Sequence, residues 1–307
     1  MLPDTDDLPF KFHKAQAAFP ALLAGATPLG AGRYGLVVDH HDGTVSKICF
    51  NDPESADTAN NARDCMLREI EALRMLQGHC FDQVRTPALV DEPVIMAADS
   101  GDYIGHFRMT KLEGKPKSWF TLLKCASPAV REQYFEQVGK LVAQFHQFTA
   151  PAAIETPQRT PVALDHESFN DETRAMVIEA HDYLMAHRQE GCIHGDFHSK
   201  NVMSDETGRL TALFDFSFYG KTDNHLMEFS WVMNQHPKAL APIIKGYEQE
   251  SGQTVDIAAL KLTAFHLELN RLLQTWEELT PAEHPDKIRA VNETVQTRLH
   301  AINKMHP

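Results

Sequence analysis

A short polar segment in the second half of the chain has the residue types that phosphoryl transfer requires. In the run IHGDFHSKNVM, residues 193–203, Asp196 precedes Asn201 by five positions, and both ends of the run are apolar. One carboxylate can orient an attacking hydroxyl group, while an amide oxygen on the same loop holds a metal ion. Histidine, aspartate and asparagine are also common in turns, so an ordinary polar loop is the alternative interpretation.

A second aspartate follows this run at the end of an apolar segment. Asp215 stands in the sequence LFDFS, nineteen residues after Asp196. A carboxylate at the end of a buried strand is costly unless it is paired with a charge or bound to a metal. A second metal ligand is expected at a strand end shortly after the loop with Asp196, and Asp215 stands at such a position.

A glycine run lies near the amino terminus, where GAGRYGLV at residues 30–37 has the form G-x-G-x-x-G-x-V. Its commonest alternative, a dinucleotide-binding turn, requires a helix directly after the glycines. The residues after Gly35 instead alternate and turn like a β-hairpin, with Asp42 and Gly43 at its tip. A strand–loop–strand arrangement lets backbone amides approach phosphate groups, and this interpretation is favoured.

Together these segments resemble the aminoglycoside phosphotransferases and choline kinases. Residues 194–201 resemble the His-Gly-Asp-x-x-x-x-Asn catalytic loop of that family. Asp215 resembles the aspartate of the kinase Asp-Phe-Gly motif, with Ser217 in place of the glycine. The resemblance covers residues 30–215 and, less specifically, the helical end. It implies an α+β, protein kinase-like fold with two lobes, and phosphate transfer to a hydroxyl group of a small molecule.

The resemblance also implies cofactors and residue roles. ATP and Mg²⁺ are the expected cofactors, and GTP stays open as the nucleotide. Asp196 is the expected base, and Asn201 and Asp215 are the expected metal ligands. His194 is expected to brace the loop through hydrogen bonds, and an incidental polar residue is the alternative interpretation. His198 matches the second histidine of the family form His-Gly-Asp-Leu-His-Pro-x-Asn and is a candidate for contacting substrate or phosphate. The residues expected to bind the nucleotide are Gly30, Gly32, Gly35, Lys47, Glu69, Met109 and Lys111.

Lys47 lies on the strand after the glycine hairpin, with apolar residues on both sides. A lysine in a strand commonly faces solvent, but its position after such a hairpin favours contact with nucleotide phosphates and pairing with a glutamate on the next helix. Glu69 is the best candidate for this partner, and Glu71 and Asp64 are alternatives.

The elements expected around these residues form a β-rich first part and a mainly helical second part. After a partly helical lead-in, strands are predicted at 35–39, 44–50, 88–94 and 103–110, with a helix whose apolar face includes Met66 and Leu76 and which stops near Gly78. A hinge at 112–116 predicts an N-lobe over 1–113 and a C-lobe over 114–307. The C-lobe is expected to contain helices at 130–149 and 171–188, strands at 201–203 and 210–214, and three or four further helices with breaks near Pro237, Gly252 and Pro281.

Composition limits the class of protein. The 307 residues include 29 Lys and Arg against 42 Asp and Glu, a net charge of −13. An acidic chain without a basic run is a poor candidate for binding nucleic acid or an anionic membrane. The five cysteines are scattered without a Cys-x-x-Cys pair, which predicts reduced thiols. With no apolar amino-terminal run and no long apolar span, the expectation is a soluble, cytoplasmic protein.

Two features favour a small acceptor over a protein. Gly195 stands where regulated protein kinases have an arginine before the catalytic aspartate, and only nine residues separate Phe216 from Leu226, with no Ala-Pro-Glu sequence. Choline, ethanolamine, an aminoglycoside, an amino alcohol or a sugar are the candidate acceptors. An aromatic and acidic site for an ammonium group is predicted among Glu228, Trp231, Tyr247, Trp276, Glu277 and Glu278.

Three alternatives stay open at this point. Atypical protein kinases also lack the long segment after the metal-binding aspartate, so a Ser/Thr protein kinase is the second interpretation. A catalytically inactive nucleotide-binding module is less favoured, because Lys47, Asp196, Asn201 and Asp215 are all present. Trp231 and Trp276 are, taken singly, more typical of core residues than of a substrate site. The oligomeric state is not predicted.

Overall fold

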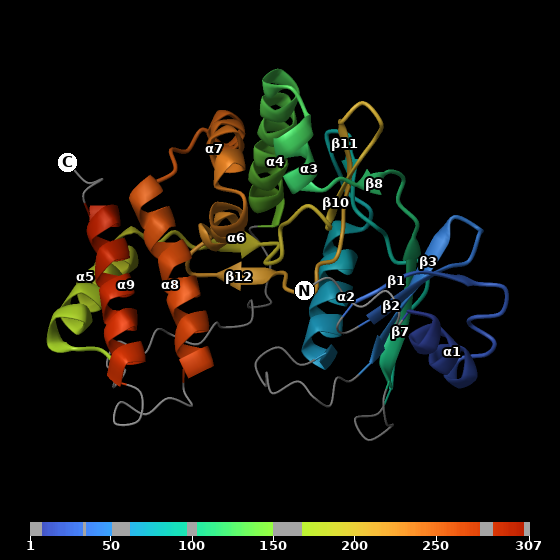
Figure 1. The fold of residues 1–307 in the computed structure, drawn as a ribbon. Coiled ribbons are helices and arrows are strands. Elements are labelled where there is room, and N and C mark those ends of the chain that lie inside the picture. Colours follow the sequence, from blue (N-terminus) through green and yellow to red (C-terminus); the bar gives the residue numbers. More distant parts are fainter. Residues whose placement is uncertain are drawn as a thin grey trace. The chain divides into compact units, whose positions relative to one another are not determined.

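The computed structural model describes residues 8–32, 35–50, 62–96, 103–149, 168–276 and 285–303. Its contacts divide the chain into two compact units, one of residues 1–118 and 194–220 and the other of residues 119–193 and 221–307. The first unit contains both main sheets, and the second is mostly helical (Figure 1). The observed architecture is mixed α+β, as predicted.

The first sheet of unit 1 contains the glycine hairpin. Its strand order is β1 (Thr27–Ala31), β2 (Gly35–Asp39), β3 (Thr44–Phe50), β7 (Tyr103–Thr110) and β6 (Val94–Ile95). All neighbouring strands in this sheet run antiparallel. The predicted strands at 35–39, 44–50 and 103–110 are therefore confirmed.

The two faces of this sheet contact different helices. Leu36, Val38 and Ile48 are fully buried in a cluster that includes Ala15 of helix α1 (Leu8–Ala18), which confirms a helical lead-in. Because side chains alternate along a strand, Lys47 points to the opposite face. Helix α2 (Ala62–Leu76) contacts β3 and β7.

Helix α2 has the predicted amphipathic pattern. Its buried face includes Met66, Ile70, Leu73 and Leu76, and the left-handed Gly78 (φ 72°) follows the end of the helix. The buried side also contains one charged residue, Glu69, only 2% exposed. A buried carboxylate requires a charged or hydrogen-bonding partner, so Glu69 is the position on this helix where a polar contact is expected.

The predicted strand at 88–94 was wrong in extent. The structure has only Val94–Ile95 as a strand, and Leu89 forms an isolated bridge with Met109. Pro93 and Pro87 lack the backbone N–H that a continuous ladder needs. Val90 still donates its N–H to the carbonyl of Arg108, so the segment follows β7 without forming a regular strand.

The second sheet joins segments that are distant in the sequence. Its order is β4 (Cys80–Phe81), β5 (Val84–Arg85), β11 (Leu210–Leu213), β10 (Val202–Ser204) and β8 (Lys115–Pro116). The strands predicted at 201–203 and 210–214 are present with ends shifted by one residue. Their pairing with β5 and β8 explains why residues 194–220 group with the N-terminal unit, whereas the sequence division placed them with 114–307. The boundary at 113/114 stays a prediction.

Unit 2 contains the remaining elements. These are α3 (Trp119–Cys125), α4 (Pro128–Thr149), α5 (Asp171–His187), α6 (Met227–Gln235), α7 (Pro237–Ser251), α8 (Ile257–Trp276) and α9 (Pro285–Asn303), with β9 (Gly191–Ile193) and β12 (Gly220–Thr222) paired as a small sheet. The breaks predicted near Pro237 and Gly252 are confirmed, and Pro281 lies outside the described residues. Helices α5, α8 and α9 share one apolar cluster and lie side by side (Figure 1).

Helices α4 and α7 approach each other through two glycines. A Cβ atom added to Gly139 would lie 1.9 Å from the carbonyl oxygen of Ile243, and one added to Gly246 would lie 2.1 Å from that of Glu136. Real Cβ atoms cannot approach so closely, so only glycine allows these two backbones to meet.

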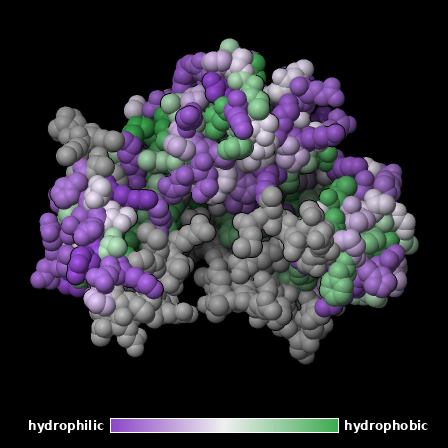
Figure 2. All heavy atoms as spheres, in the orientation of Figure 1, coloured by the Kyte–Doolittle hydropathy of each residue, from purple (hydrophilic) through white to green (hydrophobic). Residues whose placement is uncertain are grey.

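The helices and the surface of the described residues were compared with what a membrane protein requires. Among the described residues, no helix combines the length and the apolar character that crossing a bilayer requires. The described atoms visible in Figure 2 are predominantly hydrophilic, with apolar side chains scattered among them. All five cysteines are free, and Cys49, Cys65 and Cys192 are buried.

Candidate active site

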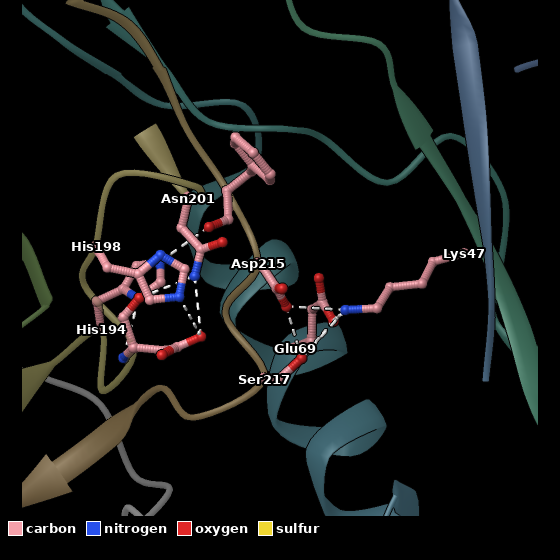
Figure 3. A network of polar contacts seen from close by, with 9 residues as sticks. Lys47, Glu69, His194, His198, Asn201, Asp215 and Ser217 are labelled. Carbon is pink, nitrogen blue, oxygen red and sulfur yellow. Dashed lines mark hydrogen bonds and ion pairs between the residues drawn. The ribbon is translucent and has the colours of Figure 1, made fainter. Parts of the chain in front are cut away.

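Lys47, on β3, forms contacts with three oxygen atoms (Figure 3). Its Nζ lies 2.5 Å from Oε2 of Glu69 on α2 and 2.9 Å from Oδ1 of Asp215, which follows β11. The third contact, at 3.1 Å, is to Oγ of Ser217. The pairing predicted for Lys47 and Glu69 is therefore present in the structure, and it also includes Asp215.

The charges in this cluster shift one another's pKa values. Desolvation acts to raise the pKa of Asp215, but the Lys47 ammonium outweighs it and lowers the value to about 2. For Lys47, desolvation is outweighed by the two carboxylates, so its pKa lies well above the usual value. Desolvation prevails at Glu69, whose pKa is raised. Lys47 and Asp215 are thus charged near neutrality.

Asp215 has a left-handed backbone, with φ 65°. Such a conformation is uncommon outside glycine, although aspartate tolerates it better than most residues. Its side chain is 38% exposed, whereas that of Glu69 is 2% exposed. Of the two carboxyl groups in the cluster, Asp215 is therefore the one that a ligand from solvent can reach.

The loop with Asp196 is organised by its neighbour Asn201. The Asn201 Nδ2 donates to the backbone carbonyl of Asp196 at 2.8 Å and to its carboxylate Oδ2 at 3.0 Å. These bonds use the amide nitrogen, so Oδ1 is the atom that can bind a cation. In Figure 3 this oxygen points to the side on which Asp215 lies.

The two predicted histidines have different positions in this loop. His194 is fully buried, and its Nε2 donates to the carbonyl of Phe214 at 2.9 Å while its Nδ1 accepts from the N–H of Asp196 at 3.3 Å. One tautomer satisfies both bonds, and the arrangement braces the loop against the segment before Asp215. His198 instead places Nε2 3.3 Å from the carboxylate of Asp196. Desolvation acts to raise the pKa of Asp196, but the contact with His198 outweighs it, and the pKa is lowered.

Gly195 fits a position that no other residue can occupy without movement. Its φ is 81°, and an added Cβ would lie 2.2 Å from the carbonyl oxygen of Phe218. The turn between His194 and Asp196 therefore depends on close approach to the segment after Asp215 as well as on a left-handed backbone.

The glycine hairpin is described at its two ends, and residues 33 and 34 lie outside the described residues. The N–H of Gly32 donates to the carbonyl of Gly35 at 2.8 Å. Added Cβ atoms at Gly30 and Gly32 would meet nothing within 4 Å, whereas one at Gly35 would lie 3.1 Å from Cε of Lys47. Gly35 thus lies beside the Lys47 side chain.

Two other residues expected to bind nucleotide lie at the end of β7 and just beyond it. Met109 is 7% exposed and pairs with Val45 across the sheet. The ammonium group of Lys111 lies 2.6 Å from Oδ2 of Asp39. This hydrogen bond is the main cause of the lowered pKa of Asp39. The roles predicted for Met109 and Lys111 stay predictions.

The residues predicted to bind the acceptor are in unit 2. The Glu228 side chain is only 1% exposed and has its Oε2 3.5 Å from Nε2 of His146. Tyr247 is buried too, and its hydroxyl lies 3.3 Å from Nδ1 of the same histidine. Trp231, on the same helix as Glu228, is 37% exposed. The side chain of Trp276 and residues 277 and 278 lie outside the described residues.

The donor set of the candidate metal site consists of hard oxygen atoms. Asp215 offers a carboxylate and Asn201 an amide oxygen. Among the described residues, no group of three or more His, Cys, Asp or Glu could hold a metal. Mg²⁺ commonly binds through one or two protein oxygens and completes its shell with water and substrate phosphate, so the two residues fit this ion.

Comparison with known proteins identifies the family. The model of the phosphotransferase enzyme family, APH, matches residues 25–261. The chain belongs to this family. It is therefore a phosphotransferase, and the family predicted from the sequence is confirmed. No curated protein sequence matches this phosphotransferase significantly.

Solved structures support the fold of this phosphotransferase. APH(2")-IIia, solved with GDP and kanamycin, has 13% identity and a TM-score of 0.62, covering 94% of this chain and 98% of that one. The amicoumacin kinase hAmiN, solved with AMP-PNP, Ca²⁺ and Ami, has 15% identity and a TM-score of 0.55, with 98% and 97% coverage. The macrolide 2'-phosphotransferase MphH from Brachybacterium faecium has 14% identity and a TM-score of 0.54, with 96% and 98% coverage. At these identities the likeness concerns the fold, which is kinase-like.

Sequence reasoning missed two features of this phosphotransferase. Ser217 was noted as a replacement for glycine, but its contacts with Lys47, Glu69 and Asp215 were not foreseen. The spacing Asp-x-Ser was the available signal, because a hydroxyl two residues after a carboxylate can bond to it in a turn. The ion pair between Lys111 and Asp39 had no signal, since it links residues 72 positions apart.

Proposed function

We propose that the protein transfers the γ-phosphoryl group of ATP to a hydroxyl group of a small molecule, with Mg²⁺ as the cofactor. The observation that supports this most strongly is the presence of two polar clusters within unit 1 (Figure 3). One joins Lys47, Glu69 and Asp215, and the other joins Asp196 and Asn201. Together they offer a cation for phosphate, oxygen ligands for a metal and a carboxylate for the acceptor.

On the nucleotide side, the proposed roles follow from charge and backbone geometry. Glu69 and Asp215 keep the Lys47 ammonium charged and fixed in direction. A phosphate oxygen would take the place of one of the three oxygens that now accept from this ammonium group. Because the side chain is already held in place, little side-chain entropy would be lost on binding. The backbone around Gly30, Gly32 and Gly35 is proposed to cover the phosphates.

Asn201 and Asp215 are the proposed metal ligands. When bound, Mg²⁺ supplies positive charge that offsets the negative charge of the nucleotide phosphates. The low pKa of Asp215, about 2, keeps its carboxylate deprotonated throughout the physiological range. The two hydrogen bonds to Asp196 hold the side chain of Asn201 in a fixed orientation.

Asp196 is proposed to position the acceptor hydroxyl. The hydroxyl oxygen forms a bond to the γ-phosphorus, the bond from that phosphorus to the β,γ-bridging oxygen breaks, and the hydroxyl proton passes to an Asp196 carboxylate oxygen. Because the pKa of Asp196 is lowered, it is a weak base. In a loose transition state the proton leaves late, so orientation contributes more than basicity.

The acceptor class is proposed from charge and from the solved relatives. A net charge of −13 favours a cationic small molecule over an anionic one. The structures similar in fold include a kanamycin complex of APH(2")-IIia and a gentamicin complex of APH(2")-IIa. An amine-bearing, hydroxylated molecule is therefore the first class to test. The partly exposed Trp231 is the proposed aromatic contact for its ammonium group.

The test is transfer of labelled γ-phosphate from ATP or GTP to a panel of aminoglycosides, choline, ethanolamine, amino alcohols, sugars and generic protein substrates. We expect labelling of a small hydroxylated molecule that requires Mg²⁺ and is abolished by EDTA. Asp196→Ala should lower the rate by roughly 100- to 10,000-fold while leaving nucleotide binding mostly intact. Asp286→Ala, at a surface position in α9, is the matched control.

Two outcomes would contradict the proposal. Labelling of proteins alone would favour the protein kinase interpretation. Nucleotide binding without transfer to any acceptor, and without hydrolysis in the presence of Mg²⁺, would favour an inactive binding module.

A further inference from the structure

Ser217 lies at the centre of the contacts around Lys47. Its Oγ is 3.1 Å from Nζ of Lys47, 3.0 Å from Oε2 of Glu69 and 2.8 Å from Oδ1 of Asp215. The residue is only 8% exposed. In the Asp-Phe-Gly form of this segment the same position has no side chain, so none of these three contacts is available.

The number of donors and acceptors explains why a hydroxyl fits here. A lysine ammonium group has three N–H donors. In this structure three oxygen atoms accept from it, one each from Glu69, Asp215 and Ser217. The serine hydroxyl also has one proton of its own, which it can donate to either of the two carboxylates.

This arrangement connects two carboxyl groups that lie close to each other. Glu69 and Asp215 both contact the same ammonium group. A hydroxyl that accepts from the ammonium and donates to one carboxylate links all three groups. A fixed network of this kind reduces the number of arrangements open to Lys47 and Asp215.

We infer that Ser217 is a positioning residue, which fixes Lys47 and Asp215 at the separation needed to bind the phosphates and metal of the nucleotide. The inference rests on the proposed function. Ser217 acts through these two side chains and is not itself proposed to contact the nucleotide. Through its hydrogen bonds the Ser217 hydroxyl holds the neighbouring side chains in place, which a glycine at this position cannot do.

The first test compares Ser217→Ala with wild type in nucleotide binding, measured by calorimetry with ATP and Mg²⁺. We expect roughly tenfold weaker binding, the loss typical of removing one hydrogen bond to a charged group. The Michaelis constant for the acceptor should stay unchanged. Ser230→Ala is the matched control, because Ser230 is also buried but its hydroxyl donates to the carbonyl of Met227 in its own helix.

The second test is a double-mutant cycle between Ser217→Ala and Glu69→Gln. If Ser217 acts through the Lys47 cluster, the two losses of nucleotide affinity should be clearly non-additive, because the residues share the Lys47 ammonium. Ser230→Ala combined with Glu69→Gln should be additive. A general destabilising effect of losing a buried hydroxyl would not produce this difference.

The outcomes separate the inference from the proposed function. If wild-type protein binds neither ATP nor GTP with Mg²⁺, the proposed function fails, and the inference fails with it. If the wild type binds and Ser217→Ala binds equally well, only the role of Ser217 is overturned. Additive losses in the cycle with Glu69→Gln would likewise overturn it.

Discussion

The side-chain amide of Asn201 donates to both the backbone carbonyl and the carboxylate of Asp196, at 2.8 and 3.0 Å. The proposed metal ligand is therefore also the residue that orients the proposed base. Loss of Asn201 would disturb two functions at once, which is not apparent from its position in the sequence.

The first prediction concerns this double role. Asn201→Ala should lower kcat on the order of 100-fold, because small misplacements of a reacting group have effects of this size. It should also raise the Mg²⁺ concentration needed for half-maximal activity. Steady-state kinetics at varied Mg²⁺ would measure both. Asn234→Ala, at an exposed position in α6, should change neither, and an unaltered Mg²⁺ dependence in Asn201→Ala would exclude the ligand role.

The second prediction concerns Gly195. Gly195→Ala should destabilise the protein more than Gly208→Ala, although both glycines have positive φ. At Gly208 an added Cβ meets nothing within 4 Å, so only the backbone cost of about 1 kcal/mol applies. At Gly195 the approach to the Phe218 carbonyl adds a steric cost, and the total should reach about 3 kcal/mol. Urea unfolding of both variants measures the difference; equal losses would contradict the tight fit of Gly195 against Phe218.

The third prediction concerns the buried His266 in α8. Burial, with a smaller contribution from His181, lowers the pKa of His266 from 6.5 to about 4. Between these values the unfolded chain binds the proton more readily than the folded one, so stability falls as the pH falls through this window. His266→Phe should remove this loss. The free energy of unfolding of the variant, relative to that of wild type, should therefore be higher at pH 5 than at pH 7.

The measurement for His266 is urea unfolding at several pH values. His300→Phe, at an exposed position in α9, serves as the control for introducing a phenylalanine. A difference between His266→Phe and wild type that does not change with pH would show that His266 is not the source of the acid sensitivity.

The fourth prediction concerns the contact between α4 and α7. In an ordinary helix, replacing glycine with alanine stabilises by about 1 kcal/mol. Gly139→Ala should do the opposite, because its new methyl group would overlap the carbonyl of Ile243. Gly246→Ala should behave in the same way against Glu136. Thermal or urea unfolding gives the sign directly, and a gain in stability for either variant would contradict the close approach.

Much of the local structure could be predicted from the sequence, because it depends on local patterns. The apolar period of α2 and the alternation in β2 and β3 have short-range physical causes, and these elements were found. Segment 88–94 was mistaken for a strand because its apolar residues outweighed the effect of Pro87 and Pro93 in the pattern. The order of strands in the second sheet depends on contacts between distant segments, which no local pattern contains.

The residues of the candidate site could be predicted from the sequence, but most of the contacts between their side chains could not. Spacing suggested Asp196, Asn201 and Asp215, and order along the chain suggested Lys47 with Glu69. The bridging of Lys47 to Asp215, 168 residues away, requires the folded backbone. The burial of Glu228 could also not be predicted from the sequence, since a glutamate on a helix is usually exposed. Its predicted contact with the acceptor would require this enclosed carboxylate to become accessible.

The grouping of residues 194–220 with 1–118 has a consequence for the order in which the protein can form during synthesis. Strands β5 and β8 leave the ribosome long before β10 and β11, which are their partners in the second sheet. The N-terminal unit therefore cannot complete that sheet until residue 213 has been made, by which time α3, α4 and α5 are already present. Domains usually fold as units in order of synthesis. Here the unit with the candidate site must wait for a segment that is encoded after part of the other unit.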